Sequence, residues 1–267
     1  MTGFSFVLVT LLLLAPAQAQ EPLELLDLPG GRFIMGNPRG EVDERPREVV
    51  VAPFRIMRHE VTNRQFRAFV RVSGHVTDPE RRGFGYVWPG RWTRVEGADW
   101  RHPAGPGSSI DGLEEHPAVQ VSQRDAAAFC AFHDARLPSG AEWEYAARGT
   151  AEPRTYPWGD EPPEELGRRR ANYGTNACCA PDDADGFLRT APVASFPSGR
   201  SPFGLDDMAG NVWEWVSTPY HRTPGWVALR GGGWGNNPYG LRVSYRHGNP
   251  PDIGLDMVGF RCAADAG

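Results

Sequence analysis

The stretch Gly204-Leu-Asp-Asp-Met-Ala-Gly-Asn-Val-Trp-Glu-Trp215 places two carboxylates, Asp207 and Glu214, on either side of Gly210. These residues favour a turn over a long helix or strand, so the backbone carbonyls are held in fixed positions. Carbonyl and carboxylate oxygens together form the all-oxygen shell that Ca²⁺ prefers. Acidic turns also occur without metal, with solvated acids and with neighbouring tryptophans in the core.

Length and composition predict one globular, loop-rich domain. The 267 residues are 40% hydrophobic, enough for one sizeable core, and 32 Gly with 25 Pro leave room for few long helices. A net charge of −5 without a basic stripe argues against a nucleic-acid partner. All 28 basic residues are Arg, which excludes Schiff-base, P-loop and pyridoxal-phosphate lysine chemistry.

The first twenty residues predict export. An apolar run, Phe4 to Leu14, is followed by the small-x-small pattern Ala17-Gln-Ala19 and is too short to span a membrane. We expect residues 1–19 to be a cleaved signal peptide and residues 20–267 to form one periplasmic or secreted domain without a membrane span. Its cysteines would then meet an oxidising compartment, where pairing is the default. They are Cys130, Cys178, Cys179 and Cys262.

Three short helices are predicted by capping boxes, in which a Ser or Thr cap is followed three residues later by an acid or amide. The boxes are Thr62 with Gln65, Ser122 with Asp125 and Ser139 with Glu142. Residues 28–36 predict a turn and a short strand, residues 41–47 a solvated loop, and residues 48–54 the next strand. Beyond residue 148, short apolar runs predict only strands and loops: residues 193–196, 226–229, 241–245 and 258–263.

A long loop is predicted between Asp78 and His116, with three tryptophans, Trp88, Trp92 and Trp100. Loops of this length inside compact domains tend to be functional or to form a packed excursion of their own. The simpler interpretation is a surface hairpin held by its tryptophans.

Eight motifs together resemble the formylglycine-generating enzyme, or sulfatase-modifying factor, family from about Leu28 to the C-terminus. They are Gly31-Arg-Phe-Ile-Met-Gly, Glu60-Val-Thr-Asn, His116-Pro-Ala-Val-Gln-Val-Ser, Arg136-Leu-Pro-Ser-Gly-Ala-Glu-Trp-Glu-Tyr-Ala-Ala-Arg-Gly, Tyr156-Pro-Trp-Gly, Gly210-Asn-Val-Trp-Glu-Trp, Arg230-Gly-Gly-Gly-Trp and Gly259-Phe-Arg-Cys. The resemblance implies a C-type-lectin-related α+β fold with few short helices and strands. Some members oxidise a substrate cysteine to formylglycine, whereas others are iron-dependent oxygenases, pigment-maturation factors or ligand-binding proteins. Fold alone does not choose among these functions.

The resemblance also implies two structural Ca²⁺ sites and one disulfide. The first site would use Asn172, the carbonyl of Tyr173, Asp185 and the carbonyl of Phe187. The second would use Asp207, the carbonyls of Gly210 and Val212, and Glu214. The implied disulfide joins Cys130 to Cys262. Cys178 and Cys179 fall outside the matching motifs, and could form a vicinal disulfide, remain thiols or bind a soft metal.

The chemistry departs from the family pattern after Trp234. Formylglycine-generating members hold Cu(I) there with two cysteines, whereas residues 235–241 contain no cysteine and Gly233 replaces a serine. Amides and a phenol do not replace a thiolate pair for Cu(I), so copper is not expected. The seven histidines form no metal-binding motif, and no Gly-x-Ser-x-Gly elbow occurs.

The leading hypothesis is an exported, divergent oxidoreductase or maturation factor that acts on a peptide or protein without the copper-dithiolate mechanism. The alternative is a non-catalytic, lectin-like binding module for a peptide, glycan or small metabolite. Either function would use a substrate pocket around the polar loop that follows Arg230. The candidate residues are Trp234, Asn236, Asn237, Arg242 and Arg246. The two arginines have a structural alternative, which is pairing with core acids.

Overall fold

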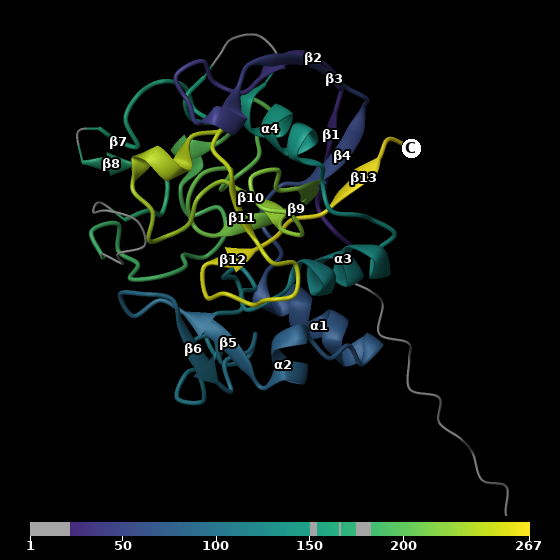
Figure 1. Cartoon of the computed structure of the whole chain (residues 1–267), viewed down its shortest axis with the longest axis vertical. Coiled ribbons are helices and arrows are strands. Elements are labelled where there is room, and N and C mark those ends of the chain that lie inside the picture. Colours follow the sequence, from purple (N-terminus) through teal and green to yellow (C-terminus); the bar gives the residue numbers. More distant parts are fainter. Residues whose placement is uncertain (1–21, 150–153, 166, 175–182) are drawn as a thin grey trace, which may run out of the picture.

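The computed structural model describes residues 22–149, 154–165, 167–174 and 183–267, so the predicted signal peptide lies outside the described residues. It has the expected α+β fold, with short elements joined by long loops (Figure 1). The helices are α1 (Asn63–Ser73), α2 (Asp78–Arg82), α3 (Gln123–Phe132) and α4 (Gly140–Arg148). The strands are β1 (Leu25–Leu28), β2 (Gly31–Met35), β3 (Arg47–Val51), β4 (Phe54–Met57), β5 (Phe84–Val87), β6 (Thr93–Glu96), β7 (Glu164–Glu165), β8 (Arg168–Arg169), β9 (Trp213–Pro219), β10 (Val227–Arg230), β11 (His247–Asn249), β12 (Val258–Gly259) and β13 (Ala263–Asp265). No helix among these residues is both long and apolar enough to cross a membrane.

The middle of the molecule is a four-stranded sheet in the order β11-β10-β9-β12. Strand β9 follows directly from the turn at residues 204–212 and pairs antiparallel with β10 and parallel with β12. In this register Glu214 lies opposite Arg230, and Trp215 lies opposite Leu229. The acidic turn is therefore attached to a strand whose first four residues are buried.

Two groups of elements flank this sheet at opposite ends of the view in Figure 1. Helices α1 and α2 lie with the β5–β6 hairpin at one end, and α4 lies with β1 to β4 at the other. Strand β4 is the centre of a second sheet, β1-β4-β13, in which the C-terminal strand pairs with β4 on the side opposite β1. The predicted strand at residues 48–54 is in fact two strands, because Pro53 lacks the N–H needed to continue the ladder.

The three predicted helices are confirmed, each with both hydrogen bonds of its capping box. Gly74 ends α1 in the left-handed conformation, with φ of 68°. The predicted loop at residues 78–116 is partly wrong, since it contains α2 and the β5–β6 hairpin. Trp88 and Trp92 do pack against each other beside that hairpin, with ring centroids 5.1 Å apart.

Two large apolar clusters and one small one, which contains Tyr173 and Leu241, form the core of the described residues. One joins α1 and α3 to the tryptophans of the loops and of β9, and includes Phe66, Phe129, Trp100, Trp215 and Trp234. The other large cluster packs α4 against β2, β3 and β4. Aromatic side chains make up much of the first cluster, which agrees with the packing around aromatic residues expected from the composition.

The prediction of a solvated loop at residues 41–47 is wrong for its centre. Residues Val42–Glu44 form a 3-10 helix, η1, and the Glu44 side chain is fully buried. The cause is a partner far along the chain, because Arg242 donates to both oxygens of Glu44 at 3.1 and 3.0 Å. A charged residue is buried when such a partner is present.

Candidate functional site

The loop after Arg230 is held together by its own amides. Trp234 is buried and its backbone N–H donates to the carbonyl of Asn211 at 2.8 Å. The Oδ1 of Asn236 accepts the N–H of Gly233 at 3.0 Å, and the Oδ1 of Asn237 accepts the N–H of Tyr239 at 3.1 Å. The second amide caps a short 3-10 helix, Pro238–Leu241. No described side chain of this loop is a thiol.

The two candidate arginines contact acidic segments of the protein itself. Arg242 makes the bidentate pair with Glu44, and Arg246 donates from Nη1 to the carbonyl of Asp43 at 2.8 Å. Arg242 is buried, and the side chain of Arg246 is 10% exposed. This geometry matches the structural alternative for both residues, and their role in substrate binding stays a prediction.

The four residues of the first predicted calcium site lie together. Asp185, whose side chain is fully buried, accepts the N–H of Tyr173 at 3.2 Å and the N–H of Phe187 at 2.9 Å. The buried Oδ1 of Asn172 has no hydrogen-bond partner, while its Nδ2 donates to the carbonyl of Arg189 at 2.7 Å. An unpartnered amide oxygen beside a buried carboxylate fits an oxygen-ligated cation.

The second predicted calcium site fits less completely. Asp207 and Asn211 have positive φ of 55° and 59°, and Gly210 has φ of 83°, so the turn is tightly wound. A Cβ on Gly210 would lie 2.2 Å from the carbonyl oxygen of Asn172, so the two predicted sites touch through their backbones. The predicted ligand Glu214 is the exception, because both of its carboxylate oxygens already have partners.

The partners of the Glu214 carboxylate come from the segment after β12 and from α4. Arg261 donates to the two oxygens of Glu214 at 2.8 and 2.7 Å, and the indole N–H of Trp143 donates to one of them at 2.8 Å. Among the described residues, no three His, Cys, Asp or Glu side chains are grouped so that they could hold a metal ion. Any cation at this turn would therefore depend largely on carbonyl and amide oxygens.

A family model described as the sulfatase-modifying factor enzyme 1-like domain matches residues 12–266. The chain belongs to this family. It is 40% identical over 275 residues to the inactive C-alpha-formylglycine-generating enzyme 2 of Bos taurus, covering 92% of this chain and 90% of that protein. It is also 39% identical over 288 residues to the formylglycine-generating enzyme of Thermomonospora curvata, covering 90% and 93%. Identity to the relative named inactive and to the one named formylglycine-generating enzyme is nearly equal, so similarity alone does not assign an activity.

Solved structures of the sulfatase-modifying factor fold agree with this assignment. PvdO from Pseudomonas aeruginosa is 30% identical, with a TM-score of 0.70 over 91% of this chain and 95% of that chain. CarF is 23% identical with a TM-score of 0.62, over 92% of this chain and 99% of that chain, which shows a shared fold. The resemblance seen in the sequence motifs is thus confirmed for family and fold.

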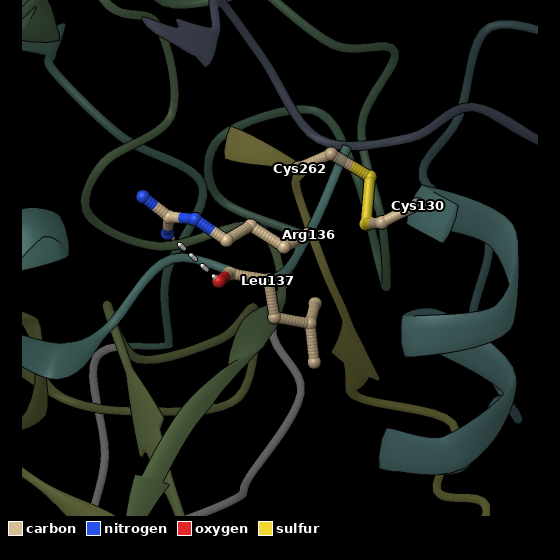
Figure 2. The surroundings of a disulfide bond; sticks show 4 residues. All are labelled: Cys130, Arg136, Leu137 and Cys262. Carbon is tan, nitrogen blue, oxygen red and sulfur yellow. Dashed lines mark hydrogen bonds between the residues drawn. A yellow bond between two sulfur atoms is a disulfide. The ribbon is translucent and has the colours of Figure 1, made fainter. Parts of the chain in front are cut away.

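The disulfide implied by the family is present. Figure 2 shows Cys130, in α3, bonded to Cys262, which directly precedes β13, with Arg136 and Leu137 beside the bond. The Cα atoms of the two cysteines are 5.5 Å apart. The cross-link fastens α3 to the C-terminal strand. Cys178 and Cys179 lie outside the described residues.

Sequence reasoning missed a pocket of about 270 Å³ beside the calcium-site segment. Its walls are mainly apolar, with Ile110 and Leu113 among them, and one side carries the ion pair of Arg189 with Asp256 at 2.5 Å. Burial raises the pKa of Asp256 to about 6, although the charge of Arg189 opposes the change. The tryptophan-rich loop was the available signal, since residues 103–113 form one wall.

Sequence reasoning used Glu60 only as part of a family motif and did not predict that its side chain is buried. Its side chain is fully buried, and neither carboxylate oxygen has a hydrogen-bond partner. Burial raises the pKa of Glu60 well above its usual value, and the charge of Asp207 raises it further. No local sequence pattern marks a glutamate as buried, so only the folded chain shows it.

Proposed function

We propose that this chain is an exported, divergent member of the sulfatase-modifying factor family that acts on a peptide or protein segment without a copper dithiolate. The loop after Trp234 carries the argument. Its polar groups, Asn236 and Asn237, brace the backbone, and the described cysteines, Cys130 and Cys262, are bonded to each other. A thiolate pair for Cu(I) would have to come from elsewhere.

Between a maturation enzyme and a binding module, the contacts favour the binding module. Arg242 is paired with Glu44 and Arg246 donates to the backbone carbonyl of Asp43, so the pocket beside Arg189 supports this choice and these two arginines do not. An apolar pocket with a few polar groups, such as the one beside Arg189, suits recognition of a small side chain or ligand. The divergent oxidoreductase stays the second candidate, because relatives of similar identity bear the name of the active enzyme.

The test supplies a Cys-x-Pro-x-Arg peptide with copper, oxygen and reductant, and examines it by mass spectrometry. We expect no aldehyde from this protein, while the Thermomonospora curvata relative, named as the active enzyme, serves as the positive control. Peptide binding is measured in parallel by fluorescence anisotropy. Turnover that is lost when both Cys178 and Cys179 are replaced by Ser would show that a thiolate pair oxidises the peptide, and would overturn the proposal. Turnover that survives this replacement would favour the divergent oxidoreductase over the binding module.

We also propose that the mature chain binds structural Ca²⁺. The support is the grouping of Asn172 and Asp185 in the first site and of Asp207 with Gly210 in the second. Calcium would supply positive charge to the buried carboxylates and to the Asn172 Oδ1, which has no donor. Calcium titration followed by melting temperature tests this, and an unchanged melting temperature in both chelator and excess calcium would contradict it.

A further inference from the structure

A second, smaller pocket lies at the start of α4, and its lining residues are different from those of the apolar pocket beside Arg189. It has a volume of about 90 Å³ and lies between the first turn of α4, the end of β9 and the β2–β3 hairpin. Because a water-sized occupant needs roughly 10–15 Å³ of such space, a small ion fits and a sugar or nucleotide does not. Exposed residues such as His221 line it together with buried ones, so the pocket reaches the surface.

The charged side chains that line this pocket are mainly basic. Of the described lining residues, three are arginines, Arg47, Arg230 and Arg246, and one is an acid, Asp43. The carboxylate of Asp43 lies 3.8 Å from the guanidinium of Arg222, so a further arginine offsets its charge. Arg47 makes no ion pair with any described residue. The lining therefore carries an excess of positive charge.

Behind the pocket, the charge of Glu144 is divided among three arginines. Its carboxylate contacts Arg230, Arg148 at 2.9 Å and Arg246 at the longer distance of 3.7 Å. One carboxylate does not neutralise three guanidiniums. In agreement with this excess, burial and the charges of Arg246 and Arg148 lower the pKa of Arg230 to about 10, although Glu144 opposes the change.

Arg246 has hydrogen-bond donors that the described residues leave unused. Its side chain is 10% exposed, and its Nη1 donates to the carbonyl of Asp43 at 2.8 Å. Its Nε and Nη2 are buried and have no hydrogen-bond partner among the described residues, because 3.7 Å to Glu144 is too long for a hydrogen bond. The Nε of Arg230 is also buried without a partner. Buried donors without acceptors are costly, so these guanidiniums favour an added acceptor at the pocket.

The first turn of α4, from Ser139 to Ala141, forms another wall of the pocket. The N-terminus of a helix carries a partial positive charge and favours anions. The N–H of Gly140 already donates to the Oγ1 of Thr218 at 2.8 Å. The N–H of Ser139 likewise donates to the carboxylate of Glu142 at 2.7 Å. The helix therefore adds to the positive potential, and the arginines remain the main donors.

We propose that this pocket binds a small tetrahedral oxyanion, phosphate or sulfate, held by Arg246 and Arg47 with the charge of Arg230 in support. Such an anion presents acceptors on all sides, and guanidinium groups bind its oxygens through charge-assisted hydrogen bonds. The excess of several arginines over acids matches a divalent oxyanion better than chloride. The bound anion would tie the β2–β3 hairpin and the chain after β10 to α4. This site is independent of the peptide and calcium proposals.

Titration calorimetry of the full mature chain tests the proposal. Sodium phosphate and sodium sulfate are titrated in a zwitterionic buffer, with sodium chloride at the same ionic strength as the reference. We expect one saturable site for phosphate and sulfate and none for chloride, with a melting temperature that rises with phosphate beyond its value in chloride. O-phosphoserine distinguishes the source of the anion, since binding as tight as that of inorganic phosphate would assign the site to a phosphoryl group on a larger molecule, and weaker binding to the free ion. Wild type without saturable phosphate or sulfate binding would overturn the proposal.

Two variants on the β2–β3 hairpin separate a specific site from a general effect of net charge. Arg47 lies opposite Met35, and Arg32 lies opposite Val50 on the other face of the hairpin. Arg47→Gln should weaken phosphate binding at least about tenfold, because a charge-assisted hydrogen bond is lost. Arg32→Gln removes the same charge outside the pocket, so it is the matched control and should bind phosphate as wild type does. An equal loss of affinity in both variants would contradict a specific site.

A third variant examines the buried donors directly. Arg246→Gln should reduce phosphate binding more than Arg47→Gln does, because it removes the two unused nitrogens as well as the charge. Wild-type affinity in a folded Arg246→Gln would overturn the proposal. If Arg246→Gln does not fold, the comparison of Arg47→Gln with Arg32→Gln decides, since both replace exposed residues.

Discussion

Two fully buried glutamates, Glu144 and Glu60, meet opposite surroundings in this molecule. Glu144 on α4 is contacted by three arginines: Arg148 at 2.9 Å, Arg230, and Arg246 at 3.7 Å. Burial alone would raise its pKa, but the charges of Arg230 and Arg148 leave the pKa of Glu144 below its usual value. At Glu60 burial dominates, and the pKa is raised.

The difference shows how this chain handles buried charge. At Glu144 the protein's own arginines supply the compensating positive charge. Burial of these arginines also has a cost, since it lowers the pKa of Arg230 to about 10. At Glu60 the cation that acts on the carboxylate, Arg261, is already paired with Glu214. The Glu144 cluster should therefore be stable without calcium, whereas the acidic turn at Asp207, where calcium is proposed, should depend on calcium.

The largest expected effect comes from breaking the Glu144 cluster. Glu144→Gln leaves three guanidiniums close together in the core, and removing one partner of a buried pair costs about 3–5 kcal/mol. Urea unfolding should show this loss equally in calcium and in chelator. A loss below about 1 kcal/mol, or one that calcium restores, would mean that the arginines are compensated by something other than Glu144.

Removal of calcium should lower stability through the acidic turns at Asp185 and Asp207, where calcium is proposed. A ligand that binds only the folded state adds about 2.7 kcal/mol at one hundred times its Kd, so chelator should lower the free energy of unfolding by a similar amount for each site of that affinity. The variant Asp207→Ala should show a smaller difference between calcium and chelator than wild type. Equal unfolding curves for wild type in both conditions would show that neither acidic turn holds the ion.

Local sequence signals predicted the elements that local chemistry controls. The capping boxes at Thr62, Ser122 and Ser139 each gave a helix, because side chain and backbone satisfy each other within four residues. The box at Thr77 with Glu80 gives α2 in the same way and was visible in the sequence, but the long-loop interpretation concealed it. The disulfide and the fold followed from the family motifs, which carry more information than composition.

Long-range charge pairing could not be predicted from the sequence. Glu44 and Arg242 are separated by 198 residues, and nothing local distinguishes Glu44 from the solvated acids beside it. The same holds for the pairing of Glu214 with Arg261 and for the isolation of Glu60. Burial of a charged side chain depends on what the rest of the chain brings to it, so these parts of the site required coordinates.

A smaller effect is expected where the two predicted calcium sites touch. In Gly210→Ala the new Cβ would meet the carbonyl oxygen of Asn172 at 2.2 Å, at a residue whose φ is 83°. Strain of this kind costs about 1–3 kcal/mol. Because the clash moves the backbone of both sites, calcium affinity should fall at both, as titration would show. Loss at one site alone would mean that the turn absorbs the change without moving Asn172.

The smallest effect serves as the reference for the region of Glu60. Thr62 is two residues beyond Glu60 and caps α1, with its Oγ1 accepting the N–H of Gln65 at 3.3 Å. Thr62→Ala should cost about 1 kcal/mol, the usual value of a lost N-cap. This hydrogen bond joins two uncharged groups, so the loss should be the same in calcium and in chelator. If calcium changed this loss, the start of α1 would itself move when the ion binds.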